Sequence, residues 1–229
     1  MKETDIESLS PVLLETENPP EVKRGFVRKV YSLLSLQLLF TSMFVYSSMN
    51  LDQLGEVVRS PVSIVCSMSV SLSIVCCIHT IGNKYPWNLV ALFVFTLSES
   101  VLVSYICMLY SNQYVTVLVA FATTVVLFIS LTAISYFSSI DFSNMNGLLY
   151  ISLITLVTMT MFQIFLQLPV LSTIIAWVSV VIFSGYVLHD TSLILKHLGP
   201  DSTIEAVISL YLDVINLFIN ILQLLKGEE

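Results

Sequence analysis

"FSNMNGLLYISLITLVTMTMFQIFLQLPVLSTIIAWVSVVIFSGYVLH", residues 142–189, runs for 48 residues without an Asp, Glu, Lys or Arg. As a single helix, at about 1.5 Å per residue, this run would be roughly 70 Å long, over twice the roughly 30 Å of hydrocarbon in a bilayer. The run must therefore fold back on itself within a membrane. Pro169 is the natural break, because proline cannot continue a helix through its own position.

The rest of the chain has the same apolar character. Of its 229 residues, 56% are hydrophobic and 11% are charged, which is far from the balance of soluble globular domains. We predict an all-α membrane protein in which residues 26–229 form one multi-span domain, with no room for a soluble catalytic domain. The last segment either crosses the membrane, giving seven transmembrane helices, or dips in and returns, giving six plus one re-entrant helix. The predicted spans are residues 27–49, 61–81, 86–109, 114–137, 147–167, 169–195 and 203–225.

The ends of the predicted spans suggest an orientation. Residues 1–25 are polar and acidic and lack the features of a secretory signal peptide, so we predict a flexible cytosolic tail. If the spans alternate in direction, seven basic residues share one side of the membrane, and the positive-inside rule makes that side, with the N-terminus, cytosolic. The net charge of −7 says little about a nucleic-acid partner, but the sequence has no basic patch to suggest one, so we predict none. The seven are Lys2, Lys23, Arg24, Arg28, Lys29, Lys84 and Lys196.

Three carboxylates stand out at depth within predicted spans: Glu99, Asp190 and Asp213. Each costs about 2.5 to 3.5 kcal/mol at the centre of a membrane helix, so such residues are retained mainly where they have a function. No Lys or Arg lies at depth in the spans to neutralise them, and this favours cations over anions. Glu99 either lines a pathway or bonds to a Ser or Thr of a neighbouring helix.

The last predicted span, "SLYLDVINLFINILQLL" at 209–225, carries a polar stripe along one helical face. Asp213 lies about ten residues into the span, roughly 15 Å deep and near the midplane. This face needs polar partners or water along its whole length, so it cannot face lipid. The stripe consists of Glu205, Ser209, Asp213, Asn216, Asn220 and Gln223.

Asp190 and Asp213 lie at comparable depth on consecutive helices. Gly199 and Pro200 between them predict a tight turn, which makes the sixth and seventh helices antiparallel neighbours. Two carboxylates that meet in a low-dielectric site share a proton over some pH range. The pair could then act as a latch, closed when protonated and open when deprotonated. Alternatively, each acid only accepts hydrogen bonds from nearby helices and holds them together.

Other polar residues carry weaker signals. His189 points about 100° away from Asp190 around the helix, and His79 and His197 fall near span ends, so we expect interfacial positions rather than ligand roles for all three. Neither a Ser-His-Asp constellation, nor a set of metal ligands, nor a Gly-rich phosphate loop is present in the sequence. We therefore predict a protein that is not an enzyme and that binds no cofactor and no resident metal.

Five stretches together resemble the transmembrane Bax inhibitor motif family, and most closely its lifeguard branch, which contains the Golgi anti-apoptotic proteins. The resemblance extends from Gly25 to the end of the chain, in order and with matching spacing. The stretches are "GFVRKVYSLLSLQLLFT" at 25–41, "YPWNLVALFVFTLSES" at 85–100, "SLTAISYFSSIDFS" at 130–143, "SGYVLHDTSLI" at 184–194 and "AVISLYLDVINLFINILQLL" at 206–225.

The resemblance implies two groups of three helices around a central last helix. It also implies a pH-sensitive calcium leak or cation channel of Golgi or endoplasmic reticulum membranes that lowers stored calcium and inhibits apoptosis. In that family the acids of the "DT" and "LYLD" motifs form the proton-sensing pair. They match Asp190 and Asp213, where the resemblance also implies transient binding of the transported calcium.

The chain departs from some relatives in two places. It has no basic residue within the second span to pair with the two acids, because Arg59 precedes the span, and it ends in "KGEE" rather than in a lysine-rich tail. A function of another class also fits the sequence. In that alternative the protein is a non-conducting membrane adaptor that binds receptors or apoptosis regulators, and its carboxylates only join helices.

Overall fold

The computed structural model describes residues 19–82, 84–109 and 114–226. Within these ranges the chain is helical, with no strand, and seven of its helices are long and apolar enough to cross a membrane. The prediction of an all-α membrane protein with seven spans is therefore confirmed. The long helices are α2 (Pro20–Asn50), α4 (Pro61–Ile81), α5 (Trp87–Met108), α6 (Tyr114–Phe137), α7 (Asn146–Leu166), α8 (Pro169–Lys196) and α9 (Thr203–Lys226).

Proline sets the first residue of three of these helices, Pro20 in α2, Pro61 in α4 and Pro169 in α8. The first turn of a helix has no use for the missing N–H, and the fixed φ of proline suits helical geometry. The predicted break at Pro169 is confirmed. Helix α7 ends at Leu166, and Gln167 takes a left-handed conformation with φ 50° before α8 begins.

Two segments differ from the predicted boundaries. Helix α2 begins at Pro20, inside the predicted tail. The helix thus extends about two turns on the N-terminal side of the apolar span that starts near residue 27. The first 18 residues of that tail lie outside the described residues. The connection between the first two spans forms a short helix, α3 (Asp52–Arg59), with an acid in its first turn and a base in its last, as the helix dipole favours.

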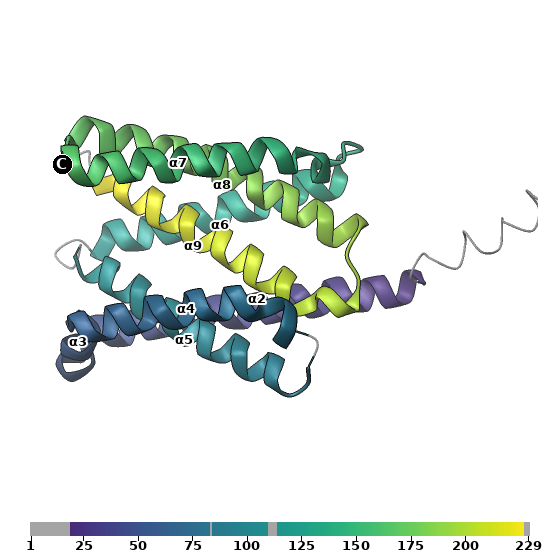
Figure 1. Ribbon diagram of the computed structural model, residues 1–229, viewed down its shortest axis with the longest axis horizontal. Coiled ribbons are helices and arrows are strands. Elements are labelled where there is room, and N and C mark those ends of the chain that lie inside the picture. The colour runs from purple at the N-terminus through teal and green to yellow at the C-terminus, as the bar shows by residue number, and fades with distance from the viewer. Residues whose placement is uncertain (1–18, 83, 110–113, 227–229) are drawn as a thin grey trace, which may run out of the picture.

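The seven long helices form two groups with α9 between them (Figure 1). Helices α2, α4 and α5 make one group, and α6, α7 and α8 make the other. Helix α9 crosses diagonally between the groups and packs against α8, α6, α2, α5 and α4. In its spanning segment 61% of the residues are buried, against 39% or less in the other six, so α9 is the central helix, as predicted.

The apolar face of α9 is largely buried, whereas Asp213 is the one buried residue of its polar stripe, Glu205 is exposed and the other four are half-buried. The largest fully buried side chain of α9, Tyr211, packs edge-on against Phe95 of α5. Large apolar side chains instead cover the outside of the bundle, for example Leu118 and Val126 on α6 and Phe165 on α7. This arrangement suits a bilayer, which solvates apolar side chains but offers no partner for polar ones.

Helix α9 is unbroken from Thr203 to Lys226, so it crosses the bundle once and the re-entrant alternative is wrong. It starts at the end of the bundle where α2 begins, which we call the N-terminal face, and it finishes at the opposite end (Figure 1). Two short 3-10 helices, η1 (Phe142–Met145) and η2 (Pro200–Ser202), also lie at the N-terminal face.

Candidate functional site between α8 and α9

The turn between α8 and α9 forms where the sequence predicts it. The backbone N–H groups of His197 and Leu198 both bond to the Leu193 carbonyl and close α8, at 2.8 Å each. Pro200 then opens η2, and α9 starts at Thr203. The two helices run antiparallel and pack against each other (Figure 1).

Asp190 of α8 and Asp213 of α9 lie on neighbouring helices, within range of electrostatic interaction. Asp213 is 5% exposed, and its Oδ2 atom has no hydrogen-bond partner among the described residues. Asp190 is the carboxylate that acts on it electrostatically across the α8–α9 interface. Burying an oxygen that accepts no hydrogen bond costs free energy, unless a water molecule, a proton or a cation binds to it.

His189 is a member of this site that the sequence interpretation missed. Its side chain is 7% exposed, and its Nδ1 lies 2.7 Å from Asp190 Oδ1, so the expectation of an interfacial position was wrong for this histidine. The two Cβ atoms do point apart around the helix, but both side chains are long enough to turn toward each other. The adjacent pair "HD" in the sequence was the signal available.

A pocket of about 130 Å³ opens beside Asp190 near the N-terminal face. Glu205 and Ser209 of α9 line it opposite Asp190, so three predicted site residues share one cavity. Asp213 follows Ser209 by one helical turn, deeper in the membrane domain. The pocket has room for several water molecules, which suits a hydrated approach to the buried acid.

The amide side chains in the deeper half of the polar stripe bond to backbone carbonyls. The side-chain amides of Asn216 and Asn220 donate to the Leu212 and Asn216 carbonyls of their own helix, at 2.8 and 2.7 Å. Gln223 donates to the Ser172 carbonyl of α8 at 3.3 Å and so joins the two helices near the opposite face. Asn216 and Asn220 thus bond along α9 itself, whereas Gln223 bonds across to α8.

Glu99 lies apart from the pair. It is half-buried on α5 and faces Ser71 of α4, although the Ser71 hydroxyl makes no hydrogen bond of regular geometry among the described residues. The structure leaves both sequence-based readings of Glu99 open, but it does not connect this residue with the pocket beside Asp190.

A buried hydroxyl network, which the sequence interpretation also missed, joins three helices. Thr41 of α2 lies 2.8 Å from the Tyr211 hydroxyl of α9 and accepts a hydrogen bond from Ser100 of α5 at 3.1 Å. One turn away, the Gln37 amide donates to Thr96 at 2.7 Å. The four-residue spacing of Gln37 and Thr41, repeated by Thr96 and Ser100, was the available signal.

These features define a class: a multi-pass helical membrane protein with a buried acid on its central helix and a half-buried acid on the helix beside it. A family model described as Inhibitor of apoptosis-promoting Bax1 matches residues 23–229. The chain belongs to this Bax inhibitor family, and the resemblance noted in the sequence is confirmed.

Relatives occur in viruses, animals and plants. The chain is 32% identical over 206 residues to the Golgi anti-apoptotic protein of Vaccinia virus (strain Lister), covering 90% of this chain and 86% of the relative. It is 33% identical over 207 residues to Protein lifeguard 4 of Mus musculus, with the same two coverages of 90% and 86%. It is 33% identical over 240 residues to Protein LIFEGUARD 1 of Arabidopsis thaliana, covering 99% and 100%.

Proposed function

We propose that the protein is a pH-sensitive calcium leak or cation channel of intracellular membranes, which lowers stored calcium and thereby inhibits apoptosis. The observation that supports this proposal best is Asp213, a buried carboxylate whose Oδ2 finds no hydrogen-bond partner in the described part of the chain and which interacts electrostatically with Asp190. Carboxylate oxygens are the ligands that calcium prefers. A membrane domain that places two of them together without a Lys or Arg attracts cations at that depth.

The same pair supplies the pH dependence. When the two acids share a proton, their repulsion is relieved and α8 stays packed against α9. When the proton leaves, two negative charges in a low-dielectric site repel each other or recruit a cation. The channel is thus closed at low pH and opens as the pH rises, with the cation passing from the pocket beside Asp190 toward Asn216 and Asn220.

The N-terminal face is cytosolic in this proposal, and the membrane belongs to the Golgi or the endoplasmic reticulum. Lys23, Arg28, Lys84 and Lys196 lie on that face or close to it, as the positive-inside rule requires of a cytosolic side. The name of the viral relative supports the Golgi. The pocket beside Asp190 then opens toward the cytosol.

Calcium flux into liposomes that contain the purified protein tests the proposal at pH 6 and pH 8. We expect more flux at pH 8 for the native chain, and loss of this pH dependence for Asp190→Asn and Asp213→Asn. Asp201→Asn is the matched control, because Asp201 is an exposed acid in η2. Absence of flux at both pH values would overturn the channel. Unchanged pH dependence in both site variants would remove the pair as its sensor.

A second candidate is the non-conducting adaptor for membrane receptors or apoptosis regulators. The contact of Gln223 favours it, because this polar residue of the stripe uses its amide to join α9 to α8. An apolar groove of about 420 Å³ between α2 and α5 also faces outward, lined in part by Leu36, Phe40 and Phe93. The liposome assay separates the candidates, since a protein that acts only by binding partners conducts nothing at either pH.

A further inference from the structure

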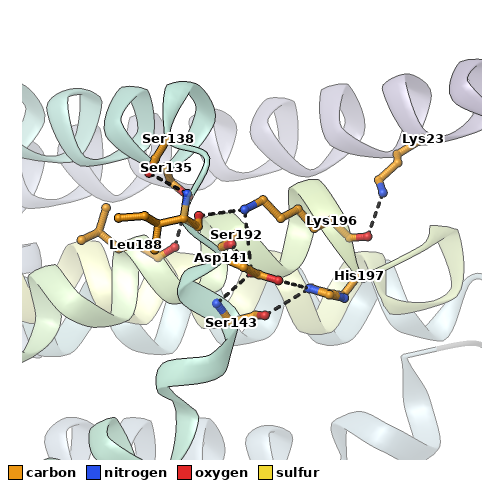
Figure 2. Close-up of polar contacts among 10 residues, drawn as sticks. Lys23, Ser135, Ser138, Asp141, Ser143, Leu188, Ser192, Lys196 and His197 are labelled. Atoms are coloured by element: carbon orange, nitrogen blue, oxygen red, sulfur yellow. Dashed lines mark hydrogen bonds and ion pairs between the residues drawn. The ribbon is translucent and has the colours of Figure 1, made fainter.

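Asp141, in the link between α6 and α7, is the centre of a polar cluster at the N-terminal face (Figure 2). Its Oδ1 accepts hydrogen bonds from the Ser192 hydroxyl at 2.9 Å and from the Ser143 backbone N–H at 3.1 Å. Its Oδ2 lies 2.9 Å from Nε2 of His197. Because a carboxylate only accepts hydrogen bonds, Nε2 must carry the proton in this contact.

Two lysines extend the cluster to further segments. Lys196 donates to the Ile140 carbonyl at 2.8 Å and lies 3.8 Å from Asp141 Oδ1. Lys23 of α2 donates to the Lys196 carbonyl at 2.8 Å. The cluster therefore fastens the end of α8 to the α6–α7 link and to the start of α2 (Figure 2).

The fastened part of α8 is the part that carries the candidate site. Ser192, which bonds to Asp141, follows Asp190 by two residues. On the other side of Asp190, the Leu188 carbonyl accepts a hydrogen bond from Ser135 of α6 at 3.2 Å. Contacts to the α6 side thus set the position of Asp190 relative to α9.

The carboxylate at the centre of the cluster keeps its charge near neutral pH. The hydrogen bond from His197, and then the one from the Ser143 hydroxyl, holds the pKa of Asp141 well below its usual range. A lowered pKa means that the contacts of Asp141 are lost only as the pH falls through that low value, so Asp141 stays charged near neutrality. Histidine is the side chain whose charge changes between pH 5 and 8, and His197 is half exposed to solvent.

We propose that Asp141 and His197 are positioning residues that form a pH-dependent clamp, which tightens on α8 when His197 is protonated. The neutral imidazole keeps a single N–H donor toward Asp141, whereas the protonated ring adds a full ion pair. The link to conduction rests on the proposed function. Acidification then acts on the same helix twice, through the buried pair and through this clamp at the surface.

The surrounding charges set limits on the clamp. Lys196 and Lys23 are cations in the same cluster and oppose a further positive charge on His197. Asp201 of η2 and Glu205 at the start of α9 are the nearest acids along the chain after His197. The ion pair is partly exposed, so salt screens it and its effect is modest, about twofold to fivefold in a local opening equilibrium.

Hydrogen exchange of the backbone amides in residues 138–145 tests the clamp without reference to flux. Protection factors are measured for the native protein in lipid nanodiscs at pH 6 and pH 8, after correction for intrinsic exchange. We expect about twofold to fivefold greater protection at pH 6. His197→Gln keeps a donor without the charge and should lose the pH dependence. His197→Lys keeps the charge and should be protected at both values.

Asp141→Asn removes the acceptor charge from the other side and should leave the segment less protected at both pH values. Asp201→Asn is again the control and should behave as the native chain. Equal pH dependence in the native protein and in His197→Gln would overturn the clamp. Flux measured in the same variants separates the two proposals. Absence of flux would overturn the proposed channel, whereas the hydrogen-exchange pattern would still show whether the clamp exists.

Discussion

His189 is a hydrogen-bond partner of Asp190 that can be either neutral or positively charged. An Arg or Lys at this position would be a permanent cation, whereas a histidine at 2.7 Å can be a neutral donor or a cation. Asp190 can therefore keep one hydrogen bond in both states, while Asp213 depends on water, a proton or an ion for its free oxygen. The chain lacks a basic residue in the second span, and His189 supplies the only ion-pair partner found for Asp190 among the described residues.

The His189 contact can be measured with a double-mutant cycle. We expect His189→Phe to lower the free energy of unfolding in detergent by about 1 to 3 kcal/mol, because it leaves a buried Asp190 oxygen without its donor. Asp190→Asn should make the loss of His189 less costly, because an amide is neutral and can find other partners. Additive effects of the two substitutions would mean that the contact contributes nothing to stability.

Helix α9 is held on one side by the α8 interface and on the other by hydroxyl groups. Its composition predicted that the polar stripe could not face lipid, and this reasoning located the helix in the interior. The sequence could not show that the apolar face would be enclosed as well, because a face that suits lipid also suits a protein core. Tyr211 illustrates the limit: it is fully buried, and its hydroxyl finds Thr41, a residue 170 positions earlier in the chain.

Thr41→Val tests how α9 is anchored to α2 and α5. Valine has nearly the same shape, but it leaves the buried Tyr211 hydroxyl without its partner, so we expect a loss of about 1 to 3 kcal/mol in the free energy of unfolding. Thr155→Val is the matched control, because Thr155 is exposed on α7 and bonds only to its own helix at Ile151. We expect less than about 0.5 kcal/mol there. Equal losses at the two positions would contradict the anchoring role.

Across the whole molecule, the two ends of the helix bundle differ in their polar contacts and charged residues. The N-terminal face has the pocket beside Asp190, the clamp at Asp141 and most of the basic residues, whereas the opposite face has the contact between Gln223 and Ser172. Apolar run lengths predicted the number of spans, since a bilayer fixes the length of a helix that crosses it. They could not predict the clamp, because Asp141 and His197 lie in connections, where sequence periodicity gives no signal and contacts depend on the finished fold.

The two faces can be told apart by labelling from one side of a sealed membrane. An unbroken α9 of 24 residues is about 36 Å long, enough to cross the hydrocarbon core once. In a chain whose native cysteines are replaced by serine, we expect a membrane-impermeant maleimide outside sealed microsomes to label Asp201→Cys. Lys226→Cys should react only after permeabilisation, because it lies at the far end of α9. Labelling of both from outside would mean that the last helix turns back within the membrane. Labelling of Lys226→Cys alone would keep the single crossing but invert the orientation that the basic residues favour.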